Sequence, residues 1–399
     1  MNNLIESATD LEENKVPVLE YKKSAKTILE KVDFEKKYSV KNNKNSENYI
    51  FRLINKYKNH NNIVVMLDGQ VVFKKSDNDF LGVTITSFTA EDYVNRSFDK
   101  RLSTYLSSES TDRMEQLLKA NLNSAILIDI NDVVTLSPPL LIVICGLGDV
   151  SHITMINSAK NSAIKIIEKT ENASKIYMNV LRQINMGENS QLEYVRIEKV
   201  NKTCFINSSI MASLKADATL KLSYADLNDC SIYSDTQINL IGENATAETK
   251  NIIFADGQDK HLHFTLIEHS AKHTAGHILN HAVAKDFSEV YLEGVGKINK
   301  GMSGSNSDQH SEIITLSDTV TVKANPYLII DEYDVKAGHG AAVGQLEDDQ
   351  LYYLMSRGLP KPEAQRLIIT GFVQPVADNI CINELKTEFE RLVQQKLEN

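Results

Sequence analysis

The 399-residue sequence contains no tryptophan and only seven prolines. None of the prolines lies between Pro139 and Pro326. Because proline removes a hydrogen-bond donor from a β-ladder, so long a stretch without it favours many stacked strands. Long apolar runs are also missing: the longest, at residues 140–145, is far shorter than the ~20 residues that a transmembrane helix needs. We therefore expect a protein without membrane spans and without a membrane partner.

Cysteine is scarce as well, and the four cysteines are far apart: Cys145, Cys204, Cys230 and Cys381. Iron–sulfur clusters are usually held by four thiolates, commonly in closely spaced CxxC-type motifs, which this sequence lacks. The chain alone is therefore a poor cage for such a cluster, and a second chain would have to supply ligands. Residues 1–15 are acidic and have no apolar segment typical of a secretion signal, so we expect a cytoplasmic protein.

Charge is unevenly distributed along the sequence. The chain carries a net charge of −10, but residues 22–58 hold eleven Lys or Arg residues against four Asp or Glu residues. Tyrosines interleave with these lysines, as they do in many nucleic-acid-binding proteins. The rest of the chain is acidic and would repel a phosphate backbone. We therefore interpret residues 22–58 as a solvated, amphipathic helical arm and expect no nucleic-acid partner.

Residues 1–125 mix helical and strand patterns. Helical spacing covers residues 24–34 and 111–122, and a short strand is expected near residues 83–85. Asp68 and Gly69 stand between two apolar runs, which is typical of a tight turn in a β-hairpin. These patterns predict a mixed α/β region at the N-terminus.

Residues 126–340 alternate between apolar and polar side chains with a period of two, which is typical of strands. For example, Leu262 and Phe264 alternate with His263 and Thr265. We expect the apolar residues of each such run to face a core and the polar residues to face water. The alternation alone is compatible with a sandwich, a barrel or a solenoid.

Residues 341–399 return to a helical period. A first amphipathic helix is expected to end at Gly358, a second to begin at Pro362 and end at Pro375, and a third to begin near Asn383. The spacing of their apolar residues alone is equally compatible with helices that pack on the rest of the chain and with helices that bind a partner protein.

Two short motifs are weak candidates for chemistry. Residues 145–150 (CGLGDV) are similar to a dinucleotide-binding loop, but Ser151 stands where the third glycine belongs, and no phosphate-binding P-loop occurs anywhere. His273, His277 and His281 are four residues apart and would share one face of a helix. The residues around them indicate strands and turns, so we interpret the three as exposed or structural histidines.

The most distinctive segments are residues 325–330 (NPYLII) and 334–346 (DVKAGHGAAVGQL). With residues 351–358 (LYYLMSRG) and 369–372 (ITGF), they resemble the SufB/SufD family of iron–sulfur cluster assembly scaffolds, and within it the SufD branch. The resemblance is strongest over residues 260–375.

The resemblance implies a mainly β fold: a right-handed parallel β-helix core at residues 126–340 between an N-terminal α/β region (1–125) and a C-terminal helical domain (341–399). It also implies two partners, a SufB-like scaffold on the last coil and a SufC-like ATPase, which would bind the ATP, on the C-terminal helices. A homodimer is left open. The residues expected to contact partners are Leu351, Tyr353, Leu354, Arg357, Gly358 and Phe372.

His339 is the predicted metal ligand. Spacing alone favours a turn histidine, whereas the resemblance implies an iron or nascent-cluster ligand at the SufB interface. Ala337 stands where many relatives have a cysteine, so no thiolate is available there, and we expect no cofactor to be held stably by this chain alone. The predicted function is a non-catalytic scaffold subunit of a SufBCD complex. The alternatives are a purely structural dimerisation module and a carbohydrate-active β-helix enzyme.

Overall fold

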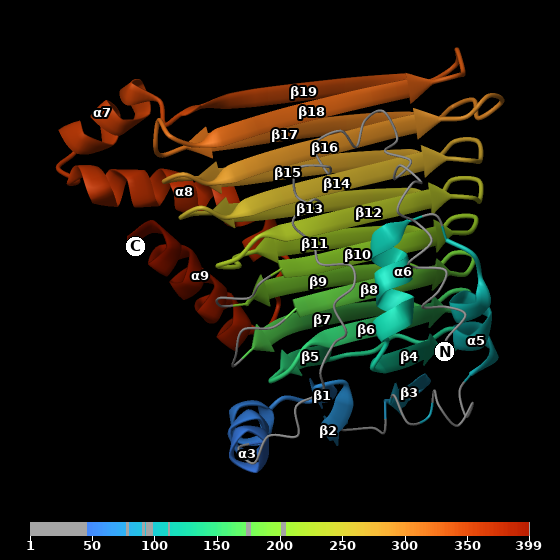
Figure 1. Cartoon of the computed structure of the whole chain (residues 1–399). Helices are drawn as coiled ribbons and strands as arrows, with labels where there is room; N and C mark the ends of the chain where they lie inside the picture. The colour runs from blue at the N-terminus through green and yellow to red at the C-terminus, as the bar shows by residue number, and fades with distance from the viewer. Residues whose placement is uncertain are drawn as a thin grey trace.

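The computed structural model describes residues 46–76, 80–89, 92, 99–110, 112–172, 177–200 and 205–398. Two sheets face each other along a rod of stacked coils (Figure 1). From β4 onwards the chain alternates between the sheets, and from β5 onwards each strand pairs in parallel with the strand of the same sheet one coil earlier. The result is a parallel β-solenoid of about 8 turns, which confirms the predicted β-helix.

Sheet A contains β2 and all odd-numbered strands except β3, and sheet B contains β3 and the remaining even-numbered strands. The strands of sheet A are β1 (Ile63–Leu67), β2 (Gln70–Lys75), β5 (Leu140–Gly146), β7 (Ala163–Asn172), β9 (Gln191–Lys199), β11 (Thr219–Asp226), β13 (Thr246–Ala255), β15 (Ala275–Ala284), β17 (Asn306–Thr315) and β19 (Lys336–Gln345). The strands of sheet B are β3 (Val83–Thr89), β4 (Ser124–Ile130), β6 (Val150–Ser158), β8 (Tyr177–Met186), β10 (Phe205–Leu214), β12 (Ile232–Leu240), β14 (Lys260–His269), β16 (Glu289–Ile298) and β18 (Thr321–Ile330).

Left-handed residues make the successive corners from sheet B to sheet A. Asn161, Asn189, Asp217, Asn244 and His273 occupy these corners with φ between 52° and 61°. Asn, Asp and His adopt this conformation more readily than most other residues. The side-chain amide of Asn189 donates to that of Asn161 over 2.8 Å, so neighbouring corners also bond to each other. His273 therefore has a structural role as a corner residue.

Both faces of the sheets are buried over much of the solenoid. Apolar side chains such as Leu220 and Leu222 fill the coil interior, as the alternation predicts. In β14 the prediction is wrong: His263 and Thr265 face the interior and are 2% exposed, whereas Leu262 packs on the outer side with residues of helix α6. The outer face of sheet B is covered by a helix here, so apolar side chains are needed on that side too.

The N-terminal region closes the first coil. Helix α3 (Ser46–Tyr57) packs beside the hairpin of β1 and β2, and helices α5 (Lys100–Ser107) and α6 (Arg113–Asn121) follow. Asp68 and Gly69 have φ of 47° and 84°, which confirms the predicted tight turn. The helix expected at 111–122 is also confirmed. The expected helix at 24–34, and the basic segment up to residue 45, lie outside the described residues.

Three helices follow the last strand: α7 (Asp348–Ser356), α8 (Lys361–Ala377) and α9 (Asn383–Glu398). Helix α8 packs on β11 and β13 of sheet A. The predicted end of the second helix at Pro375 is wrong, because α8 continues to Ala377. Pro375 lies in the last turn of α8. Its missing N–H removes one backbone hydrogen bond there, and only two further helical residues follow it. No described helix is long and apolar enough to span a bilayer.

Candidate functional site

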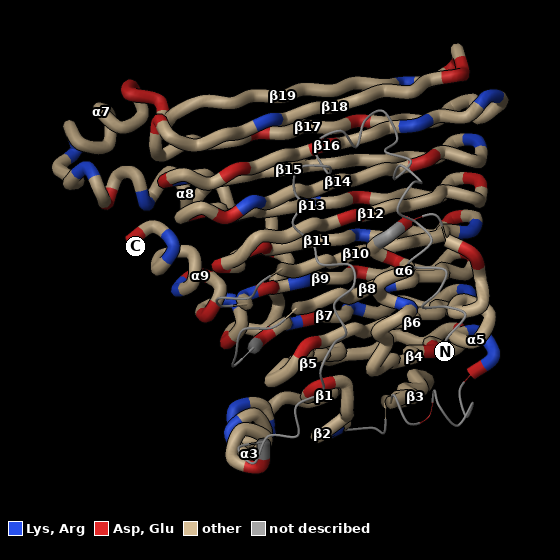
Figure 2. The backbone as a smooth tube through the Cα atoms, in the orientation of Figure 1, with Lys and Arg blue, Asp and Glu red and all other residues tan. Residues whose placement is uncertain are grey.

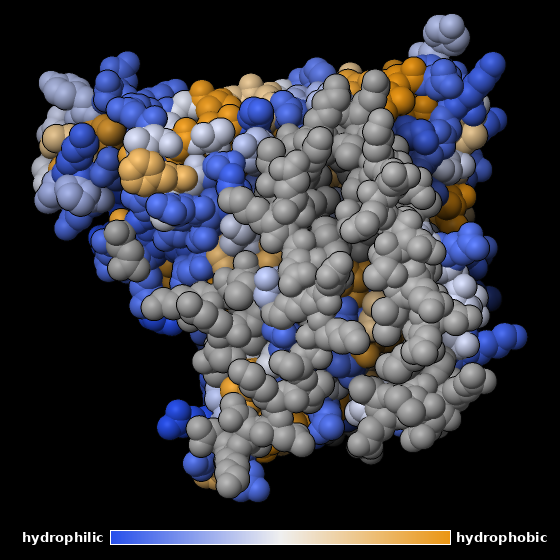
Figure 3. Space-filling model, viewed as in Figure 1, coloured by the Kyte–Doolittle hydropathy of each residue, from blue (hydrophilic) through white to orange (hydrophobic). Residues whose placement is uncertain are grey.

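The last coil of the solenoid is open among the described residues. Strands β18 and β19 are the outermost strands of sheets B and A, and each pairs with a neighbour on one side only. All of their residues are exposed or half-buried, unlike the buried strands of earlier coils. Tyr327, Ile329 and Val343 are 38%, 40% and 51% exposed. Figure 3 shows apolar atoms along this end of the molecule, where Figure 1 places β18 and β19.

An open end of this kind is prone to association with another chain. Unpaired backbone N–H and C=O groups on an edge strand can extend a sheet into a partner, and terminal coils of repeat proteins usually need a cap. Apolar side chains such as Val343 add surface that association would bury. The end formed by β18 and β19 therefore has the properties of a docking edge, and we call it the open edge.

His339 lies in the middle of β19 and is exposed. It pairs in register with Gln309 of β17, whose side-chain amide donates to the backbone oxygen of Tyr327 across the coil, over 2.7 Å. Register partners on parallel strands point to the same side, so His339 stands on the inward side at the open edge. The adjacent Gly340 lies close to the next strand, where a Cβ would come within 2.9 Å of Nδ1 of His310.

The residues predicted to contact partners divide into two groups. On α7, Tyr353 is 57% exposed and stacks with the guanidinium of Arg357, which lies 5.2 Å from the ring centroid. Gly358 terminates this helix with φ of 95°. Leu351 is 7% exposed, and Phe372 stacks on His281 of β15 with ring centroids 4.1 Å apart. The first group faces outward, whereas Leu351 and Phe372 contact this chain itself.

Leu354, the remaining residue of the predicted set, is half-buried on α7. Contact of all six residues with a partner stays a prediction. Other large apolar side chains of α7 and α8 are also exposed: Tyr352 is 75% exposed, Met355 44% and Leu367 of α8 53%. The α7–α8 face therefore offers apolar surface of its own, separate from the open edge.

A column of buried polar side chains runs through the coil interior, and the sequence patterns gave no indication of it. Its members bond to one another from β7 to β14: Glu168, Arg182, Tyr194, Ser208, Arg196, Glu198, Tyr224, Asn228, Asp226, His261 and His263. We call this set the interior polar column. All of its members are 5% exposed or less.

The most strongly charged part of the column joins Arg182 to Glu168. The Nε–H of Arg182 donates a hydrogen bond to the carboxylate of Glu168 over 3.0 Å, and its Nη1–H donates to the hydroxyl oxygen of Ser208 over 2.7 Å. Burial tends to raise the pKa of Glu168, but the charge and hydrogen bonds of Arg182, together with Arg196 and Tyr194, outweigh it and lower the pKa. Both groups are therefore charged at neutral pH, in a place from which water is excluded.

The environment of another buried histidine, His152 of β6, is expected to make the stability of the protein depend on pH. Its ring contacts the hydroxyls of Ser124 (2.7 Å) and Thr154 (3.0 Å), and burial lowers its pKa to about 4. The unfolded chain, with an ordinary histidine pKa near 6.5, therefore binds a proton between pH 6.5 and 4 that the folded chain does not. We expect this histidine to reduce the free energy of unfolding by about 2 kcal/mol when the pH falls from 7 to 5.

Urea unfolding of the wild type and of His152→Asn at pH 7 and pH 5 measures this effect. The variant lacks the titrating group, so it should lose less stability on acidification, whereas carboxylates contribute equally to both proteins. Equal losses in the two proteins would contradict the assignment.

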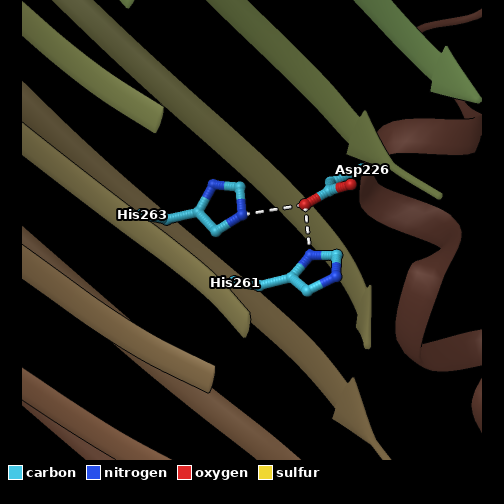
Figure 4. A group of neighbouring side chains, drawn as sticks. All are labelled: Asp226, His261 and His263. Atoms are coloured by element: carbon cyan, nitrogen blue, oxygen red, sulfur yellow. Dashed lines mark hydrogen bonds and ion pairs between the residues drawn. The ribbon is translucent and has the colours of Figure 1, made fainter. Parts of the chain in front are cut away.

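Three residues of the interior polar column form a compact cluster (Figure 4). The Oδ2 atom of Asp226, at the end of β11, lies 2.7 Å from Nδ1 of His261 and 2.9 Å from Nε2 of His263, both on β14. Asn228 holds the other carboxylate oxygen, Oδ1, with its backbone N–H (3.2 Å) and its side-chain amide (2.7 Å). The exposed fractions of Asp226, His261 and His263 are 0%, 0% and 2%.

This cluster is the one place among the described residues where three potential ligand atoms of His, Cys, Asp or Glu lie within 4.8 Å of one another. Burial tends to raise the pKa of Asp226, but His261 and then His263 outweigh it and hold the pKa well below its ordinary value. Asp226 is therefore ionised at neutral pH. A His-x-His pattern on one strand face was the only sequence signal for the cluster, because Asp226 is 35 residues before His261.

A polar cleft of about 620 Å³ lies between the solenoid, α3 and α9. Lys169 and Lys56 bond to Glu171 over 2.7 Å and 2.5 Å, and Lys396 bonds to Asp229 over 2.7 Å. Figure 2 shows residues of both charges along α9. Burial tends to raise the pKa of Glu171, but Lys169 and Lys56 lower it to about 2. This carboxylate is therefore ionised at neutral pH, whereas a glycosidase needs a protonated carboxylic acid. We interpret the ion pairs of the cleft as contacts that hold α3 and α9 to the solenoid.

The other sequence candidates have structural positions. Cys145 and Cys230 are buried and Cys381 is exposed, while Cys204 lies outside the described residues. Burial raises the pKa of the Cys145 thiol, so it is protonated and unreactive at neutral pH. Residues 145–150 end β5 and begin β6 without a helix, and His277 and His281 lie on β15, so the expected strand setting of these residues is confirmed.

Comparison with known proteins identifies the family. A family model for the SufBD core domain, described as SUF system FeS cluster assembly, matches residues 147–372. The chain belongs to the SufB/SufD family. The matched residues extend from the coil of β6 to helix α8 and include the open edge, His339 and the interior polar column.

Individual relatives agree with this assignment. An iron–sulfur cluster assembly protein SufD from Bacillus subtilis is 32% identical over 252 residues, which are 62% of this chain and 57% of the relative. SufBD family proteins from Mycobacterium bovis and Staphylococcus saprophyticus are 28% and 29% identical over 54% and 40% of this chain, and over 25% and 34% of their own lengths. The chain thus spans between a quarter and somewhat over half of these relatives. The predicted family is confirmed, and the first relative agrees with the SufD branch.

Proposed function

We propose that this chain is a non-catalytic scaffold subunit of a SufBCD complex. In this role it pairs with a SufB-like chain through the open edge and presents His339 to the iron–sulfur cluster assembled there. The observation that carries the proposal is the position of His339: an exposed imidazole on the inward side of the last coil, whose strands pair with a neighbour on one side only among the described residues.

The cluster is the cargo of this process, and the chain supplies only part of its coordination. Neutral imidazole is a suitable ligand for iron. Among the described residues, His339 shares no site with two further Cys, His, Asp or Glu ligands, and Ala337 offers no thiolate. A partner seated on the open edge would bring its own ligands within reach, and iron would be held only while both chains are in place.

The α7–α8 face is the proposed docking surface for a SufC-like ATPase, which would bind and hydrolyse the ATP. Tyr352, Tyr353 and Met355 are exposed there. Strand β19 ends at Gln345 and α7 begins at Asp348, so only two residues separate the strand of His339 from this face. A displacement of α7 by the ATPase would therefore act directly on the open edge.

The test is His339→Ala in the complete complex, purified with its SufB-like and SufC-like partners. We expect the variant to assemble normally but to lose most of its iron and acid-labile sulfide, because the imidazole ligand is missing. His310→Ala is the matched control: this histidine is exposed on the adjacent strand β17, and its loss should leave cluster content unchanged.

Size-exclusion chromatography of each complex separates a lost ligand from lost assembly. If His339→Ala assembles and carries the wild-type amount of iron and sulfide, the ligand role is wrong, and a purely structural dimerisation module becomes the better description.

A further inference from the structure

We propose that Asp226, His261 and His263 bind one divalent transition-metal ion inside the solenoid. This site is separate from the open edge, and its existence does not depend on the proposed function. Two imidazoles and a carboxylate are a common ligand set for Zn²⁺ and Fe²⁺ in proteins.

The backbone places the three side chains as a metal site requires. His261 and His263 are two residues apart on β14, so both rings project from the same, inward face of sheet B. Asp226 projects from sheet A opposite them, so the ligands come from two sides of the coil (Figure 4). Both sheets are fixed by backbone ladders on either side of these strands. The site is thus built on rigid elements.

The distances are close to those of an occupied site. In a tetrahedral zinc site with bonds of ~2.0–2.2 Å, neighbouring ligand atoms lie roughly 3.3–3.6 Å apart. Oδ2 of Asp226 lies 2.7 Å and 2.9 Å from the two imidazole nitrogens. An opening of about half an ångström, which small side-chain rotations supply, would admit the ion. The three protein ligands leave a fourth position for water.

The surroundings orient the carboxylate as ligand partners do in metal sites. Asn228 occupies Oδ1 with two N–H donors, which leaves Oδ2 to face the imidazoles. Asn228 is in turn held by Glu198, over 3.4 Å. Such outer contacts fix ligand geometry and raise affinity for the metal. The far nitrogen of His261, Nε2, is buried and has no hydrogen-bond partner among the described residues.

Access to the site is restricted by α9. Lys396 of α9 donates to the backbone oxygen of Asn228 over 2.7 Å and to Asp256 over 2.7 Å. The segment next to Asp226 is therefore covered by the C-terminal helix. We expect the ion to enter while the chain folds and to exchange slowly afterwards, so the metal must be supplied during expression.

The experiment uses the full chain, produced in medium supplemented with Zn²⁺ or Co²⁺ and then dialysed against metal-free buffer. We expect about one metal ion per chain by elemental analysis, and the visible absorption of low-coordinate Co²⁺. Asp226→Asn and His263→Gln nearly preserve side-chain volume and remove a ligand, so each should lower the metal content at least tenfold. His310→Gln, which changes an exposed histidine of β17, should retain it.

A further variant keeps the proposal falsifiable if the buried substitutions disturb folding. His263→Cys replaces one ligand by a thiolate, so it should retain Co²⁺ and add a sulfur-to-cobalt charge-transfer band. A folded wild-type chain without metal, equal metal content in Asp226→Asn and the wild type, or a Co²⁺ spectrum unchanged by His263→Cys would each overturn the proposal.

Discussion

Arg182→Met is expected to lower the free energy of unfolding by about 3–5 kcal/mol. The substitution removes the guanidinium that bonds to Glu168 and Ser208 in the coil interior and leaves the carboxylate of Glu168 charged, with an exposed fraction of 1%. An unpaired buried charge is among the most destabilising changes known in proteins, because water cannot replace the lost partner. Urea unfolding monitored by circular dichroism measures the loss.

Two comparisons isolate the cause of this destabilisation. The double variant Arg182→Met, Glu168→Gln removes both charges and should recover more than half of the loss. Lys165 and Glu193 form a 2.9 Å ion pair on neighbouring strands β7 and β9, but their side chains are 22% and 46% exposed. Lys165→Met should therefore cost only about 0–1 kcal/mol. A loss of that small size for Arg182→Met would mean that water reaches the column.

The sequence was sufficient to predict the strands because a solenoid buries side chains in regular alternation. In β11, Leu220, Leu222 and Tyr224 all face the interior. However, where other elements cover the outer face of a strand, alternation of apolar and polar residues does not show which set points into the coil. This is why β14 was assigned the wrong way round: its apolar residues contact the outer layer, and its histidines reach Asp226.

The interior polar column could not be predicted from sequence patterns for a related reason. Glu168 and Arg182 look like solvent-facing residues, and only the stacking of coils shows that they are partners in a closed space. Their separation of 14 residues is set by the length of one half-coil, which varies along the chain. The position of His339 at an open edge was likewise accessible only through family resemblance, because an exposed strand residue has no pattern of its own.

Val343→Lys is expected to weaken binding of a SufB-like partner at least thirtyfold, or ~2 kcal/mol, if the open edge is the proposed interface. Val343 of β19 pairs in register with Ile313, so it points inward at the last coil, and it is 51% exposed. Natural proteins use inward-pointing charges on edge strands to prevent sheet extension, because pairing would bury the charge. Isothermal titration calorimetry with the purified partner measures the affinity.

The control for this substitution is Phe287→Lys. Phe287 is apolar and 64% exposed, but it lies at a corner between β15 and β16 and on neither of the two edge strands. Phe287→Lys adds the same charge as Val343→Lys. A general electrostatic effect would therefore weaken binding in both variants, whereas an effect of the open edge would weaken it only in Val343→Lys. Both changes are at exposed positions, and the free energy of unfolding of the isolated chain should change by no more than about 1 kcal/mol. Wild-type affinity in a stable Val343→Lys protein would place the partner elsewhere, and the α7–α8 face would then be the surface to mutate next.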